Sequence, residues 1–88
     1  MKANTKKIFE AFKFEMHTKL EKNNRKNPDR TDRVVMLAAL NNEIAELNAR
    51  FKLHDSGDVE LSKKAVTSNC ANISNFAMFV AYHAGEHP

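Results

Sequence analysis

The stretch LAALNNEIAELNARF, residues 37–51, decides the fold class of this chain. Its large apolar residues recur at intervals of three and four: Leu37, Leu40, Ile44, Leu47 and Phe51. This repeat gathers them into one stripe along an α-helix, which is typical of a helix that packs lengthwise against others. We therefore predict a helix over residues 32–51 in an all-α protein.

Two more helices are predicted, one before and one after this stretch. Over residues 5–23, apolar side chains again fall three and four positions apart and form one face. After the turn HDSGD a third helix is predicted, with Ser56 or Asp58 as its N-cap and Gly85 just beyond its end. The chain is thus expected to be a single domain, residues 1–88, with three main helices.

The length and charge of the chain indicate the kind of partner it has. A chain of 88 residues buries a modest fraction of its surface, so we predict assembly as a homodimer or homotetramer. The net charge of +3 favours phosphate-bearing ligands but falls far short of a dedicated nucleic-acid-binding arm. A small anionic ligand, and not a nucleic acid, is the expected partner.

Cysteine content and hydropathy indicate the compartment. Cys70 is the single cysteine, so the chain has no intramolecular disulfide, and no apolar run of signal-peptide or membrane-spanning length is present. The prediction is a cytoplasmic protein that does not enter a membrane.

Polar residues interrupt two of the predicted helices at helical spacing. Glu43 and Glu46 lie on one flank of the second helix, either as a solvated edge paired with Arg50 or as part of a site. Asn69 and Asn72 fall within the apolar face of the third helix. An unpartnered buried amide costs about 1–3 kcal/mol, so both should be hydrogen-bonded or line a pocket. The alternative role is to set helix register in an oligomer.

Three segments together resemble the single-domain MazG-like nucleoside triphosphate pyrophosphohydrolases of bacteriophages: FEAFKFEMHTKLEKNNRKN at 9–27, LNNEIAEL at 40–47 and SNCANISNFAMFVAYHAG at 68–85. The resemblance implies a MazG-like helical bundle completed by oligomerisation, with composite pockets between subunits. It also implies magnesium-dependent attack of water that releases a nucleoside monophosphate and pyrophosphate.

The metal positions of this chain depart from the family's pattern. The resemblance places the five acidic positions of the family on Asn42, Glu43, Glu46, Asn69 and Asn72. Only Glu43 and Glu46 are carboxylates, and Mg²⁺ strongly prefers anionic oxygen. A weakened magnesium site is therefore expected.

The resemblance also implies nucleotide contacts. The expected nucleotide-binding residues are Lys22, Arg25, Lys26, Glu43, Glu46, Asn69, Asn72, Asn75 and Phe76. The basic residues would meet phosphates, the glutamates ribose, base or a residual cation, and the amides and Phe76 the rest of the nucleotide.

The resulting hypothesis is a MazG-like pseudoenzyme that binds a nucleotide or a nucleotide-derived signal without efficient hydrolysis. In a phage it would sequester such a signal of host defence. Three alternatives stay open: an active Mg²⁺-dependent pyrophosphohydrolase, a substrate-trapping variant of one, and a purely structural helical module.

Overall fold

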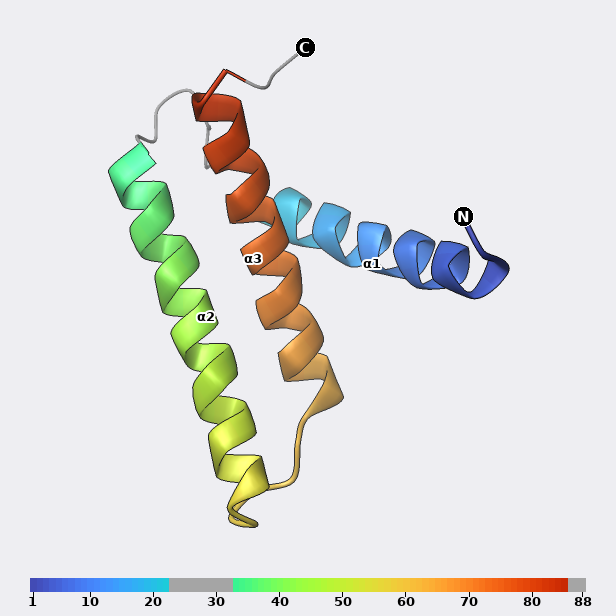
Figure 1. Ribbon diagram of the computed structural model, residues 1–88, viewed down its shortest axis with the longest axis vertical. Coiled ribbons are helices and arrows are strands. Elements are labelled where there is room, and N and C mark those ends of the chain that lie inside the picture. The colour runs from blue at the N-terminus through green and yellow to red at the C-terminus, as the bar shows by residue number, and fades with distance from the viewer. Residues whose placement is uncertain (23–32, 86–88) are drawn as a thin grey trace.

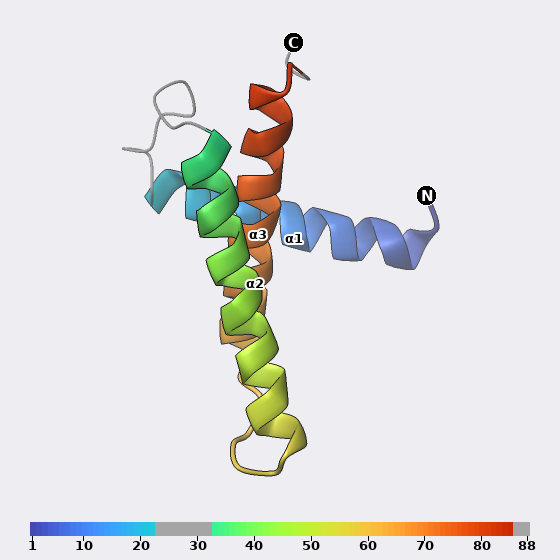
Figure 2. The ribbon, with the colours of Figure 1, turned by 60° about the vertical axis from the view of Figure 1, so that its left-hand side comes forward.

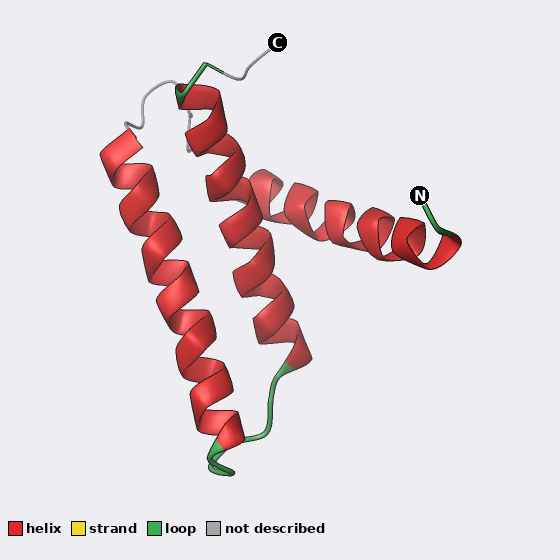
Figure 3. Cartoon of the chain, in the orientation of Figure 1, coloured by secondary structure: helices red, strands yellow, loops and turns green. Residues whose placement is uncertain are grey.

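The protein is all-α, as predicted. The computed structural model describes residues 1–22 and 33–85, which form three helices and no strand (Figures 1 and 3). They are α1 (Ala3–Lys22), α2 (Arg33–Asp55) and α3 (Lys63–His83). None of the three has a stretch both long enough and apolar enough to span a membrane.

Helix α3 is the central element. α2 and α3 lie side by side and run in opposite directions, and α1 crosses α3 at a large angle (Figures 1 and 2). α3 packs against both other helices, whereas no Cα atom of α1 lies within 8 Å of a Cα atom of α2 among the described residues. The helix contacts in the described part of the chain are therefore centred on α3.

The start of α3 differs from the prediction. The helix begins at Lys63, and its N-cap is Ser62, whose extended backbone (φ −79°, ψ 109°) is typical of a capping residue. The Ser62 hydroxyl oxygen accepts a hydrogen bond from the backbone N–H of Ala65 at 3.2 Å. The predicted caps, Ser56 and Asp58, were wrong.

The turn after α2 explains this error. The Ser56 hydroxyl lies 2.9 Å from the carbonyl oxygen of Leu53 and 2.9 Å from a carboxylate oxygen of Asp58, so it closes the end of α2. Gly57 follows with φ +82°, a conformation that favours glycine after a helix. The HDSGD segment thus ends the second helix, which extends to Asp55, and does not begin the third.

Few of the described residues are buried, and half of the buried residues are asparagines. Met36 and Ala71 are its buried apolar residues, and Asn69 and Asn75 are its buried polar ones, at 4% and 5% exposed. Most large apolar side chains of the helices are only half-buried or are exposed. Burial around α3 therefore concentrates on asparagine side chains.

Helix α1 joins α3 through its C-terminal half. Met16 and Leu20 are half-buried there, and the Asn75 side-chain amide donates to the Met16 carbonyl oxygen at 3.0 Å. The N-terminal half of α1 projects away from the other helices, and Phe9 on it is 49% exposed (Figures 1 and 2).

Candidate functional site

Two glutamates of α2 converge on one asparagine of α3. Because residues three apart lie on the same side of a helix, Glu43 and Glu46 both reach toward α3. The side-chain nitrogen of Asn69 donates to Glu43 at 2.7 Å and to Glu46 at 3.1 Å. Asn69 is 4% exposed, whereas Glu43 is half-buried and Glu46 is exposed, so the two hydrogen bonds lie at the edge of the interior.

Arg50 and Asn72 complete a network around this contact. The Arg50 Nε donates to the Asn69 side-chain oxygen at 2.7 Å, and the Asn72 amide nitrogen donates to Glu43 at 3.2 Å. Arginine only donates and carboxylates only accept, so the orientation of the Asn69 amide follows from its partners. We call Glu43, Glu46, Arg50, Asn69 and Asn72 the amide–carboxylate network.

The network confirms one expectation and changes another. Asn69 and Asn72 are hydrogen-bonded, as two amides in an apolar face require. Arg50, which the alternative of a solvated edge paired with Glu46, donates instead to Asn69 of α3.

The donor set of the network does not fit a magnesium centre. Mg²⁺ needs converging oxygen ligands, whereas Asn69 points N–H groups at both carboxylates. Within residues 1–22 and 33–85, no three His, Cys, Asp or Glu side chains lie close enough together to hold a metal ion. The amide occupies the space between the acids that a cation would need.

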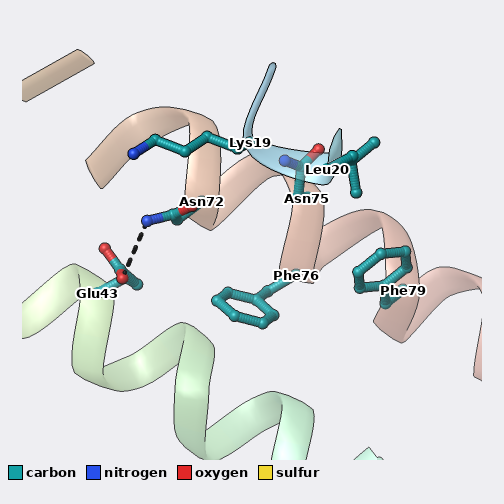
Figure 4. A pocket seen from close by; sticks show the side chains of 7 residues that line it. All are labelled: Lys19, Leu20, Glu43, Asn72, Asn75, Phe76 and Phe79. Atoms are coloured by element: carbon teal, nitrogen blue, oxygen red, sulfur yellow. Dashed lines mark hydrogen bonds between the residues drawn. The ribbon is translucent and has the colours of Figure 1, made fainter. Parts of the chain in front are cut away.

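A first pocket lies where α1, α2 and α3 come closest to one another (Figure 4). It encloses about 170 Å³ and is lined by Lys19, Leu20, Glu43, Asn72, Asn75, Phe76 and Phe79. The two aromatic rings offer an apolar surface, while the amide and carboxylate groups lie opposite them (Figure 4). An aromatic ligand with polar edges suits such a lining.

Asn75, which lines this pocket, has a buried side-chain oxygen. Its side-chain nitrogen is held by the Met16 carbonyl, and its side-chain oxygen is buried with no hydrogen-bond partner among the described residues. Buried polar atoms without partners are rare in folded proteins and call for an explanation.

A second, more polar pocket adjoins the first. It is an open depression of about 380 Å³ lined by Glu43, Glu46, Arg50, Ser62, Lys64, Ala65, Ser68, Asn69 and Asn72. Two cationic side chains and two hydroxyl side chains thus line it together with the two glutamates. Because Glu43 and Asn72 line both pockets, one ligand can extend across them.

Most of the predicted site residues come together, and a few do not. Glu43, Glu46, Asn69, Asn72, Asn75 and Phe76 all line one or both pockets. Lys22 is exposed at the end of α1 and lines neither pocket, and Asn42 is exposed on α2 outside the network. Arg25 and Lys26 lie outside the described residues.

Sequence reasoning missed Lys19 and Lys64 as pocket residues. Lys19 lies three positions after Met16, so the helical period already placed it on the side of α1 that meets α3. Lys64 carried no such signal, because its position depends on α3 beginning at Lys63.

Comparison of the chain with protein-family models, with curated proteins and with solved structures found no match.

Proposed function

We propose that this protein binds a nucleotide, or a small molecule derived from one, across the two adjoining pockets and does not hydrolyse it efficiently. The proposal rests on one observation: Glu43 and Asn72 line both pockets, so the pocket with the two aromatic rings adjoins the pocket with the cationic side chains. A nucleotide has the same division, an aromatic base at one end and phosphates at the other.

The aromatic pocket suits the base. Phe76 and Phe79 supply rings on which a base can stack, an interaction worth about 1–3 kcal/mol per base.

The polar pocket suits the phosphates. Lys64 and Arg50 provide positive charge, and Ser62 and Ser68 provide hydroxyl groups. Lys19 stands at the other pocket, on the side of α1, so cationic groups flank the ligand at both ends.

The amide–carboxylate network supports binding without efficient hydrolysis. Metal-dependent hydrolysis of a phosphoanhydride needs a cation that activates water and offsets developing charge. Here the N–H groups of Asn69 satisfy the glutamates, and Arg50 supplies a fixed positive charge nearby. A resident magnesium ion is accordingly no part of the proposed mechanism.

The proposal extends to biology through the resemblance to MazG-like enzymes. A chain with that family's nucleotide pocket but without most of its acids would serve to retain a nucleotide. In a phage, such a protein would sequester a nucleotide-derived signal of host defence.

The test is retention of nucleotides by the purified protein. A panel of linear and cyclic nucleotides is incubated with it, with and without Mg²⁺, and free and retained fractions are analysed by mass spectrometry. One nucleotide should be retained intact. Lys64→Ala and Phe76→Ala should each weaken its binding about tenfold or more, because each removes a contact worth at least about 1.4 kcal/mol.

Two matched variants control this experiment. Lys63→Ala removes the neighbouring cation and Phe14→Ala removes an aromatic ring that is 68% exposed, and neither residue lines either of the two pockets described above. Both should bind like the native protein. If no nucleotide is retained, or if Lys63→Ala weakens binding as much as Lys64→Ala does, the proposed site is wrong.

A second candidate function is an active pyrophosphohydrolase. The convergence of Glu43 and Glu46 on one atom favours it, because rotation of the Asn69 side chain would leave two carboxylates facing each other. It would show Mg²⁺-dependent release of pyrophosphate in the same assay, and Glu43→Gln would abolish that release.

A further inference from the structure

Helix α1 packs on α3 with little buried surface. None of its residues is buried, and Met16, Lys19 and Leu20, in its C-terminal half, are half-buried. Ile8 and Phe14 of the same helix are 63% and 68% exposed. Because α1 crosses α3 at a large angle, the two helices meet over a short length (Figures 1 and 2). Apolar contact is not directional, so an apolar contact of this size does not by itself fix the orientation of α1.

A directional contact joins the two helices where they cross. The side-chain nitrogen of Asn75 on α3 donates to the carbonyl oxygen of Met16 on α1 at 3.0 Å. Asn75 is 5% exposed, so water competes little for this hydrogen bond. The acceptor is a backbone atom, so the bond fixes the position of the helix itself and not only that of a flexible side chain.

The bonded carbonyl lies one turn before the residues of α1 that line the first pocket. Lys19 and Leu20 are three and four positions after Met16, which places them on the same side of the helix. They form one edge of the pocket, and Phe76 and Phe79 of α3 form another (Figure 4). A rotation or tilt of α1 about Met16 would therefore change the shape of the pocket.

The polar atoms of Asn75 are engaged inside the protein. Its nitrogen bonds Met16, and its oxygen is buried with no hydrogen-bond partner among the described residues. A buried acceptor without a partner costs at least as much free energy as one hydrogen bond contributes, so a gain in stability does not explain an asparagine here. A buried polar residue can instead fix one arrangement of packed helices at a cost in stability.

We propose that Asn75 is a positioning residue, which holds the Met16 carbonyl and so keeps Lys19 and Leu20 of α1 at the edge of the first pocket. Asn75 acts on a ligand through α1 and not by touching it. The position of α1 does not depend on the identity of the ligand, whereas the effect of Asn75 on nucleotide affinity rests on the proposed function.

Acetylation of lysine side chains measures the position of α1 without any ligand. Asn75→Leu keeps a side chain of similar size and removes the donor, and the Met16 carbonyl retains its helical hydrogen bond from Leu20. We expect the half-buried Lys19 to react about threefold faster or more, relative to the exposed Lys6, because α1 loses a hydrogen bond that holds it on α3. Mass spectrometry of peptides gives both rates. The melting temperature should stay within about 4 °C of the native value, since the unpartnered oxygen is removed as well.

Two further variants make this measurement specific. Asn48→Leu makes the same substitution at an exposed position of α2 that lines neither pocket, and it should leave the reactivity of Lys19 unchanged. Asn75→Ser, whose side chain is too short to reach Met16, should raise that reactivity even if the interior does not accommodate leucine. Unchanged reactivity of Lys19 in both Asn75 variants would overturn the proposal.

Calorimetric titration with ATP connects the position of α1 to the site. Both Asn75 variants should bind ATP about fivefold or more weakly than the native chain, whereas Asn48→Leu should bind it equally well. Weaker binding with unchanged reactivity of Lys19 would mean that Asn75 touches the ligand directly. Unchanged affinity with raised reactivity would mean that α1 does not shape the site, and either result would overturn the proposal. If the native chain binds no ATP, the result counts against the proposed function, and the acetylation of Lys19 still decides the role of Asn75.

Discussion

The side chain of Asn69 takes part in three hydrogen bonds with other side chains. Its oxygen accepts from Arg50, and its nitrogen donates to Glu43 and to Glu46. Each of these partners is charged, and hydrogen bonds to charged groups are the stronger ones. An asparagine in this position holds two carboxylates close together without a metal ion.

Replacement of Asn69 by aspartate should therefore create a dependence on metal. Asn69→Asp sets a third carboxylate about 3 Å from the other two. We expect the melting temperature to fall by at least about 4 °C without divalent cations, because like charges repel at this distance, and to recover with millimolar Mg²⁺ or Mn²⁺. Thermal unfolding followed by circular dichroism measures both effects.

The matched control for this substitution is Asn4→Asp, at an exposed position near the start of α1. It adds the same charge and should show no response to metal. An Asn69→Asp variant with a melting temperature independent of Mg²⁺ would mean that the two glutamates do not form a cation site even when a third acid joins them.

At the scale of the helix, a single hydroxyl defines where α3 begins. Ser62 has the extended backbone of an N-cap and accepts the hydrogen bond of Ala65. Ser56 lies in an equally plausible sequence context, but its hydroxyl closes the end of α2. The two serines therefore differ in what their removal should do.

Ser62→Ala should lower the free energy of unfolding by about 1 kcal/mol, the usual effect of losing an N-cap side chain. Ser62→Asp, which retains an acceptor at this position, should keep most of the stability. Urea denaturation measures both variants. Ser56→Ala should cost less than about 0.5 kcal/mol, as for other exposed substitutions. If its effect equalled that of Ser62→Ala, the assignment of the cap would be wrong.

At the scale of the molecule, the three helices bury so little apolar surface that we do not expect the monomer to be stable by itself. Met36 and Ala71 are the buried apolar residues among those described, and the N-terminal half of α1 projects from the rest. A domain with so small a core usually needs a further source of stability, such as assembly. The homodimer or homotetramer predicted from the length of the chain would supply it.

Assembly of this kind makes unfolding depend on concentration. If the folded chain is dimeric and the unfolded chain is not, each tenfold increase in protein concentration should raise the melting temperature by about 3–5 °C. Calorimetry over two decades of concentration tests this. A native melting temperature that does not change with concentration would argue for a monomer.

Helical periodicity by itself determined the fold class and the polar side chains that meet between α2 and α3. The pairs Glu43 with Glu46 and Asn69 with Asn72 lie where a period of 3.6 residues places them, whereas Leu37, Ile44 and Phe51 of the apolar repeat are 38%, 39% and 39% exposed. Within a helix, position along the chain determines direction around the axis, so such local inferences are reliable.

Only the tertiary structure decided how the helices meet. It left Asn42 outside the network, although Asn42 precedes Glu43 by a single residue, and it brought Lys64 into the polar pocket. It also turned the Asn69 amide so that its N–H groups face the glutamates. The rotation of α2 against α3 and the orientation of an amide depend on contacts between residues far apart in the chain, and no local pattern encodes them.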